Sequence, residues 1–353
     1  MVQDTGMITE ACDVCGAGPM VPHVEVALPR VGSVWINRCV RSACGFRQIR
    51  PRLTVPDLRA FYSADYFDDA SPAGFQGYAR QWHRYQRDAY FLARYLHAFR
   101  SRGRLLEVGS ALGFLLGALA GNSDWTVEGV EISSFAAWYT RDRFGVTVHE
   151  STLEAAHLQS NSFDFVIQKD LLEHVLEPRR HLEETFRIMR PGARLRLITP
   201  NGDADVGPLE RARLGSSNEI PVLDQGHVSF FSRRQLLQLL NETGFTVLDL
   251  KNIGLRRGIR ALGVVPFWRR RSEVMLRDDL MRTVLNRSES MFDVDEEEYR
   301  QRAERMDEEI ERSSSWLRRW KPYYYYRHLV KVCDALPSSM TFGQDFDVLA
   351  QKF

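Results

Sequence analysis

A glycine-containing turn between two apolar runs is the first place in this sequence whose residue types could do chemistry. The stretch LLEVGSALGFLL (105–116) places Glu107 before Gly109, Ala111 and Gly113. Glycine permits positive φ angles and close backbone approach, as a strand-to-helix turn around a ligand requires. A dinucleotide-binding turn would have glycine at position 111, where the backbone contacts a pyrophosphate. Ala111 therefore favours a ligand without pyrophosphate.

Glu131 supplies the second part of this candidate site. It lies 22 residues after Gly109, at the predicted end of the next strand, where a carboxylate can accept hydrogen bonds from ribose hydroxyls. A structural turn and an ordinary strand-end acid are the alternative interpretations of the two features taken singly. Together they favour a nucleoside ligand. Thr152 and Leu153, after the third predicted strand, could border an adenine ring or belong to a plain loop.

The elements that must position these residues alternate between strand-like and amphipathic helical runs. Strands are predicted at 104–108, 126–132, 146–149, 163–168, 193–199 and 245–251. Such alternation is typical of an open parallel sheet covered by helices, so we expect an α/β fold. Ser232, with Gln235 three residues later, predicts a helix start, and Gly244 predicts the end of that helix.

A series of short motifs between residues 162 and 201 connects these features to a known family. In order along the chain they are Ser162-Phe163-Asp164, Glu173-His174-Val175, Pro178, Pro191-Gly192 and Thr199-Pro200-Asn201. With the glycine turn and Glu131, the series resembles class I S-adenosylmethionine-dependent methyltransferases, over about residues 60–255 plus the closing strand. Ala111 and Ala193 replace glycines that are frequent in that family. The resemblance implies a Rossmann-like, seven-stranded sheet whose last strand is antiparallel.

The resemblance further implies that S-adenosylmethionine binds across the carboxyl ends of the strands. Glu107, Gly109, Ser110 and Gly113 are predicted to hold its methionine end, and Glu131 its ribose. Ile132, Thr152 and Leu153 are predicted to contact the adenine, and Gln168 and Lys169 to lie near the sulfonium. Tyr78 and Arg84 belong to a segment predicted to cover the cofactor. Core packing is the alternative role for the aromatic residues of the covering segment.

Methyl transfer from a sulfonium requires alignment rather than generation of an electrophile, and alignment can supply several kcal/mol, up to roughly 7–11 in ideal cases. A hydroxyl acceptor also needs a base, a role that suits histidine near neutral pH. The candidates are His227, in the segment that covers the acceptor pocket in this family, and His174. Asp224 could orient His227 or act itself. The alternatives are a backbone-bonded helix-start residue for His174 and loop ordering for His227.

Four of the five cysteines cluster near the beginning of the sequence. Cys12 and Cys15 are separated by two residues, and Cys39 and Cys44 by four. Each pair ends in Cys-Gly, which resembles a zinc knuckle, and four thiolates suit tetrahedral, structural Zn²⁺. The longer second gap predicts one distorted knuckle, and free thiols are the alternative. An odd cysteine count in a long chain argues against a disulfide framework.

These patterns divide the chain into five segments: a zinc-ribbon-like module (1–55), a helical preface or lid (56–102), an S-adenosylmethionine-binding Rossmann-like domain (103–253), a helical insertion (254–339) and a final strand of the same sheet (340–353). The net charge of +1 disfavours nucleic acid or an anionic membrane as partner. No apolar run approaches the ~20 residues of a membrane span, and the first residues lack a secretory signal. We expect a cytoplasmic protein, and the long charged helices are compatible with a homodimer.

Three functions compete at this point. The first is methyl transfer to a small molecule, such as a sugar or a natural-product intermediate, at oxygen and with a histidine base. The second is a tRNA or protein methyltransferase, which would bind its acceptor with the N-terminal ribbon and with arginines and tyrosines in three stretches: Arg256 and Arg257; Arg269, Arg270 and Arg271; and the tyrosines of 323–326. The third is a scaffold that binds the cofactor without catalysis.

Overall fold

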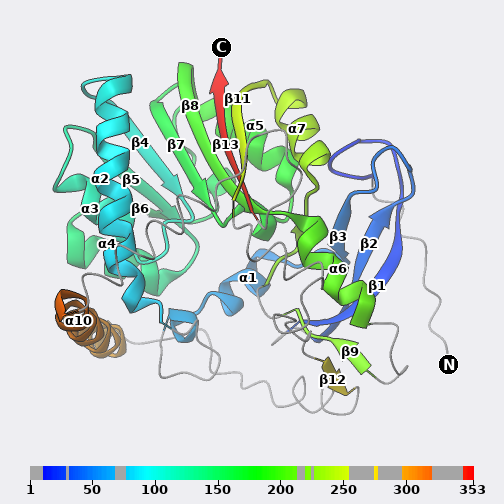
Figure 1. The fold of residues 1–353 in the computed structure, drawn as a ribbon, viewed down its shortest axis with the longest axis horizontal. Coiled ribbons are helices and arrows are strands. Elements are labelled where there is room, and N and C mark those ends of the chain that lie inside the picture. The colour runs from blue at the N-terminus through cyan, green and yellow to red at the C-terminus, as the bar shows by residue number, and fades with distance from the viewer. Residues whose placement is uncertain are drawn as a thin grey trace.

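A seven-stranded sheet forms the centre of the molecule (Figure 1). The computed structural model describes residues 11–28, 32–67, 77–212, 219–223, 226–253, 274–276, 296–319 and 345–353. The strands are β4 (Arg104–Val108), β5 (Thr126–Glu131), β6 (Thr147–Glu150), β7 (Phe163–Lys169), β8 (Met189–Pro200), β11 (Phe245–Ile253) and β13 (Asp345–Lys352). Their order is β11-β13-β8-β7-β4-β5-β6, and β13 is antiparallel to both neighbours. This arrangement confirms the predicted α/β sheet and its antiparallel last strand.

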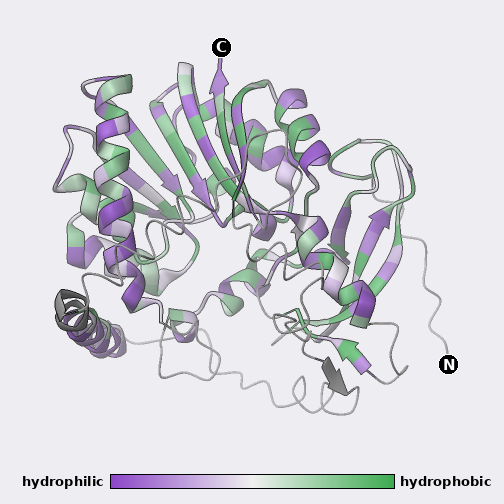
Figure 2. Cartoon of the chain, viewed as in Figure 1, coloured by the Kyte–Doolittle hydropathy of each residue, from purple (hydrophilic) through white to green (hydrophobic). Residues whose placement is uncertain are grey.

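Helices cover both faces of the sheet because its central strands are apolar on both sides. Leu105 and Phe165 pack against α2 (Trp82–Phe99) and α3 (Phe114–Ala120). Their neighbours Leu106 and Val166 face the opposite side, with α5 (Pro178–Ile188) and α7 (Arg233–Glu242). Figure 2 shows the strands of this sheet largely in the hydrophobic colour. The capping box of Ser232 and Gln235 opens α7 as predicted.

The carboxyl end of β4 is the point where the winding of the sheet reverses. From β4 the chain passes through α3 to β5 on one side, then through α4 (Ser134–Phe144) to β6. It returns to β7 on the other side of β4. In open α/β sheets, ligands bind at such a reversal point. The glycine turn, which follows β4 directly, therefore lies where the fold places a ligand.

The N-terminal module shares a sheet with a much later part of the chain. Strands β1 (Met20–Leu28), β2 (Gly32–Cys39) and β3 (Arg47–Arg50) are joined by β10 (Ser229–Phe230), which pairs antiparallel with β3. The Ile49 N–H donates to the Val228 carbonyl at 2.8 Å. The module is thus bonded directly to the segment that follows His227.

The preface contains α1 (Val55–Phe61) and two 3-10 turns, η1 (Ala64–Phe67) and η2 (Ala79–Gln81), before α2. Between β8 and α7 lie α6 (Gly202–Ala212) and β9 (Glu219–Pro221). Within the region predicted to be a helical insertion, α10 (Glu296–Arg319) is a helix, and Figure 2 shows much of its ribbon in the hydrophilic colour. The same region also holds β12 (Val274–Leu276), a strand that the sequence did not predict, paired with β9.

The arginine stretches at 256–271 and the tyrosines of 323–326 lie outside the described residues. Among the helices that the structure does describe, none combines the length and the apolar composition that crossing a bilayer requires.

Candidate active site and cysteine cluster

The turn after β4 has the backbone shape that its glycines allow. Gly109, Ala111 and Gly113 have φ angles of 73°, 48° and 64°. Gly113 is the N-cap of α3, and a Cβ atom there would lie 2.2 Å from a methyl carbon of Thr140 on α4. Glycine is therefore required at 113 for both conformation and packing. Ala111 takes a left-handed conformation that alanine rarely adopts.

Glu131 fastens this turn to the end of β5. One of its carboxylate oxygens accepts the Ala111 N–H at 2.7 Å, and the other accepts the Ser133 N–H at 2.8 Å. Each oxygen of an ionised carboxylate has two lone pairs, so the carboxylate, which the Ile132 N–H also contacts, keeps acceptor capacity for the ribose hydroxyls. The sequence predicted the ribose role and did not reveal this additional structural one.

Two polar groups beside the turn are buried without partners. Glu107 is 4% exposed, and neither its Oε2 atom nor Ser110 Oγ has a hydrogen-bond partner among the described residues. Burial raises the pKa of Glu107 to about 8; the nearby Lys169 opposes this shift and Glu131 adds to it. A ligand that carries an ammonium group would satisfy Glu107. The site therefore fits the amino end of S-adenosylmethionine.

The remaining residues predicted to contact the cofactor occupy different surroundings. Leu153 is buried at the start of the 3-10 turn η3 (Leu153–Ala155), directly after Thr152, and Ile132 is half-buried beside Glu131. The Lys169 ammonium donates to the Tyr85 hydroxyl at 3.0 Å.

Three of the residues predicted to contact the cofactor, Tyr78, Gln168 and Arg84, are placed by their side-chain neighbours in the structure. Tyr78 packs against Phe114, the first residue of α3, at a ring distance of 6.1 Å. Gln168 donates to Thr185 on α5 at 2.8 Å, and Arg84 pairs with Asp88 on its own helix at 3.6 Å. Tyr78 therefore lies beside the turn, whereas the contacts of Gln168 and Arg84 are with helices.

The two candidate histidines lie together, with ring centroids 5.0 Å apart. His174 ends the 3-10 turn η4 (Leu172–His174), and its Nδ1 lies 3.0 Å from the Gly226 carbonyl oxygen and 2.8 Å from the Tyr62 hydroxyl. His227 Nδ1 lies 2.8 Å from a carboxylate oxygen of Asp205. Tyr62, which follows α1, thus brings the preface into contact with these histidines.

The acid that orients His227 is Asp205, which sequence reasoning missed. Asp224, the predicted partner, lies outside the described residues. The available signal was the position of Asp205 in the helix that follows β8, because parallel strands place their carboxyl ends at one edge of the sheet. Asp224 was considered because it is close to His227 along the chain. Asp205, which only the fold brings close, was not considered.

Glu173 is the third member of this cluster. Its side chain is 2% exposed, and its Oε2 atom accepts the Thr199 hydroxyl at 2.9 Å. Burial raises its pKa to about 8, while the charge of His227 counteracts that shift. Burial and the neighbouring His227 lower the pKa of His174 to about 3. Burial would also lower the pKa of His227, but Asp205 outweighs it and raises the value to about 9.

Comparison with known proteins agrees with this geometry. Residues 79–250 match a family model described as a methyltransferase domain. Residues 79–250 therefore resemble the domain of S-adenosylmethionine-dependent methyltransferases. The match includes the glycine turn, Glu131 and the two histidines, so the site described above lies within that domain.

Curated relatives of the methyltransferase domain include two fungal proteins. An O-methyltransferase of Pyrenophora dematioidea is 26% identical over 168 residues, which are 45% of this chain and 59% of that protein. The O-methyltransferase cnsE of Penicillium expansum is 30% identical over 166 residues, 44% of this chain and 56% of that protein. The matched part thus spans less than two thirds of the length of either relative.

Among solved structures, a putative methyltransferase of Bacillus halodurans aligns with 76% of this chain and 98% of its own, at a TM-score of 0.41 and 14% identity.

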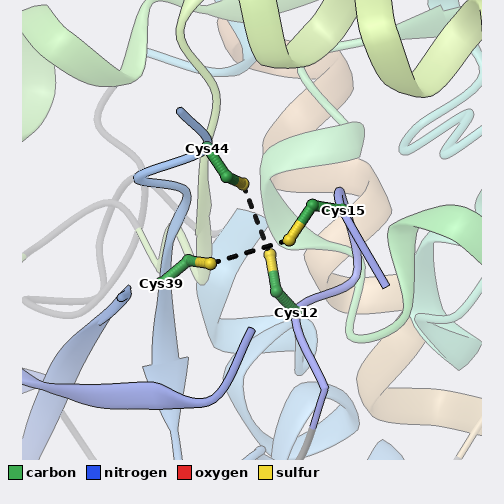
Figure 3. Close-up of side chains that lie close together, drawn as sticks. All are labelled: Cys12, Cys15, Cys39 and Cys44. Atoms are coloured by element: carbon green, nitrogen blue, oxygen red, sulfur yellow. Dashed lines mark hydrogen bonds between the residues drawn. The ribbon is translucent and has the colours of Figure 1, made fainter. Parts of the chain in front are cut away.

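The four clustered cysteines lie against the methyltransferase domain, with their sulfur atoms pointing toward one another (Figure 3). Cys12 Sγ is 3.7 Å from Cys44 Sγ, and Cys15 Sγ is 3.7 Å from Cys39 Sγ. A disulfide would need about 2.05 Å. Four thiolates around Zn²⁺ at about 2.3 Å, in a tetrahedron, are about 3.8 Å apart. The donor set therefore fits zinc.

The longer gap of the second cysteine pair is accommodated by a turn. Cys44 and Gly45 both donate their N–H groups to the Arg41 carbonyl, at 2.8 and 2.9 Å. Gly45 adopts a φ of 61°, much as Gly16 does, at 66°, after the first pair. The distortion expected from the four-residue gap is thus confined to one additional turn.

Proposed function

We propose that this protein transfers a methyl group from S-adenosylmethionine to a hydroxyl group of a small molecule. The observation that carries the proposal is the set of buried polar side chains of Glu107, Ser110 and Glu131 at the reversal point of the sheet, where Glu107 and Ser110 each keep an oxygen without a partner among the described residues. When bound, S-adenosylmethionine supplies an activated methyl group on a sulfonium. The names of the two fungal relatives support oxygen as the acceptor atom.

The surroundings of His174 favour an acceptor with a flat, apolar body. Tyr62 stands edge-on to His174, with ring centroids 5.7 Å apart, and it also contacts Tyr66 at 5.0 Å. Phe61 lies 5.0 Å from Tyr62. Aromatic side chains of this kind bind apolar rings and exclude water from a reaction site. A macromolecular acceptor and a homodimer stay predictions, since no described contact bears on either.

Of the protein's own groups, His227 is the base that we propose for the acceptor hydroxyl, and with a pKa of about 9 it acts near neutral pH through its minor unprotonated form. Asp205 accepts from Nδ1, and this contact orients the ring and directs Nε2 away from α6. We expect Asp205→Asn to lower kcat by about 10- to 100-fold, because the ring loses its carboxylate partner. The affinity for S-adenosylhomocysteine should not change. A variant with normal kcat would show that Asp205 does not position His227.

The orientation of the bound cofactor can be tested by measuring whether the Glu107 carboxyl group loses its proton when the ligand binds. With a pKa of about 8, Glu107 is mostly protonated at pH 7 in the free protein. An ammonium group bound beside it favours the carboxylate and lowers that pKa. Binding of S-adenosylhomocysteine at pH 7 should therefore release close to one proton.

The proton release is measured by calorimetry in buffers of different ionisation enthalpy. The Glu107→Gln variant, which cannot ionise, should release none. Equal binding enthalpies for the wild type in all buffers would mean that the amino end of the cofactor does not reach Glu107.

We further propose that the four-cysteine cluster holds a structural zinc ion, for which four protein ligands leave no open coordination position.

The proposed activity as a whole is tested by incubating the protein with methyl-labelled S-adenosylmethionine and a library of hydroxylated aromatic and sugar compounds. A product heavier by one methyl group supports it. Failure to bind S-adenosylhomocysteine would refute it.

A further inference from the structure

Glu173, His174 and His227 direct three ligand atoms at one small volume. A carboxylate oxygen and a ring nitrogen from each histidine all lie within 4.8 Å of one another. We propose that this cluster, the acceptor-side triad, binds a divalent metal ion that activates the acceptor hydroxyl. The inference rests on the proposed function and deepens it, because it assigns the acceptor side of that same site to a metal.

One carboxylate oxygen of Glu173 accepts a hydrogen bond, and the other does not. Thr199 donates to Oε2, whereas Oε1 is buried and has no hydrogen-bond partner among the described residues. Buried polar atoms are rarely left unpaired, and each exception calls for an explanation. Oε1 is 3.7 Å from Nε2 of His174. This distance is too long for a hydrogen bond and close to the ~3.0–3.5 Å that separates two ligands bound to one ion at about 2.1 Å.

Both histidines are arranged as metal ligands usually are. The Gly226 carbonyl, 3.0 Å from Nδ1 of His174, can only accept, and the Tyr62 hydroxyl at 2.8 Å can donate or accept; a proton on Nδ1 satisfies both contacts and leaves the lone pair on Nε2. Asp205 accepts from Nδ1 of His227 in the same way. A metal-bound histidine donates its second ring N–H to a carboxylate or a carbonyl, and this contact fixes the tautomer.

A metal-free proton network is the competing explanation, and two observations count against it. Glu173 Oε1 bonds to neither imidazole, although such a network would use it. The charge balance also favours a cation: Asp205 is bonded to His227, and the charge of Asp170 acts on both Glu173 and His227. Two acids besides Glu173 thus favour positive charge at this cluster, Asp205 by direct contact and the exposed Asp170 at longer range.

The donor set of two imidazoles and one carboxylate suits Mn²⁺, Fe²⁺, Co²⁺ or Zn²⁺. Three protein ligands leave coordination positions open, unlike the four cysteines, so an acceptor oxygen can bind the ion. The ion lowers the pKa of the hydroxyl, and the proton leaves to solvent. The oxygen then bonds to the methyl carbon as the carbon–sulfur bond breaks, giving a methyl ether and S-adenosylhomocysteine. His227 serves as a ligand in this scheme rather than as the base.

The test uses the full-length, zinc-loaded protein and Mn²⁺ as the probe, because thiolates disfavour that ion. Mn²⁺ binding is measured by calorimetry and by electron paramagnetic resonance, with S-adenosylhomocysteine present. We expect one Mn²⁺ per chain, with affinity lowered at least about 100-fold in Glu173→Gln and His227→Gln and about 10-fold in Asp205→Asn. The matched control is His149→Gln, because His149 pairs with Glu128 at 3.3 Å outside the cluster. This variant should bind Mn²⁺ as the wild type does.

The outcomes separate the metal from the methyl transfer. Unchanged affinity for S-adenosylhomocysteine in the triad variants shows that they fold, so a loss of Mn²⁺ in them supports the site. Wild-type Mn²⁺ affinity in both Glu173→Gln and His227→Gln overturns it. Absent Mn²⁺ binding by a wild type that binds S-adenosylhomocysteine also overturns it, and His227 then stays the proposed base. Absent S-adenosylhomocysteine binding refutes the proposed function instead.

Discussion

Glu131→Ala is expected to weaken the binding of S-adenosylhomocysteine at least about 100-fold, because hydrogen bonds to charged groups contribute about 1.5–3 kcal/mol each and two are lost with the ribose. The same change releases the N–H groups of Ala111 and Ser133, which the carboxylate holds at 2.7 and 2.8 Å. Ala111, at a φ of 48°, would then lose the contact that holds its left-handed conformation. Calorimetry at fixed temperature measures the affinity.

Glu150→Ala is the matched control for this experiment. Glu150 ends the neighbouring strand β6, and its half-exposed side chain pairs with Arg141 at 3.2 Å. It is an ordinary strand-end acid, so its removal should leave the affinity unchanged. Thermal unfolding of Glu131→Ala distinguishes a lost contact from a lost fold. A folded Glu131→Ala variant with wild-type affinity would show that the ribose does not bind there.

Cys44→Ser is expected to abolish stoichiometric zinc and to lower Tm by about 10 °C or more. Structural zinc contributes folding free energy directly, and in a domain of this size each kcal/mol corresponds to roughly 2–4 °C. The Cys44 carbonyl accepts from Gln235 and Arg234 at the start of α7, at 2.6 and 3.2 Å. Loss of the ion should therefore loosen the contact between the N-terminal module and α7.

Metal analysis and thermal unfolding measure these two effects. The control is Cys333→Ser, since Cys333 is the fifth cysteine of the sequence and was not predicted to bind the ion. It should retain one zinc per chain. Removing zinc from the wild type with a chelator should reproduce the lowered Tm of Cys44→Ser. A Cys44→Ser variant with full zinc content and unchanged Tm would contradict the assignment.

Local patterns predicted the strands of the central sheet closely. Strand β4 lies at Arg104–Val108 as expected, because its apolar run ends at a glycine turn. Strand β8 begins at Met189, four residues before the predicted 193, because it continues through Pro191 and Gly192, residue types that are uncommon inside strands. The antiparallel closing strand was also predicted, on the family resemblance.

Long-range pairings were the part that the sequence could not predict. The partner of His227 was sought in Asp224, three residues away, and the fold supplied Asp205 from the helix after β8. Strands β3 and β10 are separated by about 180 residues in the chain, and alternation of apolar residues indicates which face is buried without indicating which strand lies alongside. The same limit hid Glu173, whose environment depends on Thr199 and on the two histidines.

The sheet that β10 completes connects the N-terminal module directly to the segment that carries His227. Val228, bonded to Ile49 on one side, also donates its N–H to the Glu173 carbonyl at 2.7 Å on the other. A chain shortened to begin at the preface would keep the turn after β4 and Glu131, which we expect to bind the nucleoside. It would lose the β3–β10 pairing that supports the loop with His227. Exchanging this segment between relatives should consequently alter which compounds are methylated while leaving the methyl donor the same.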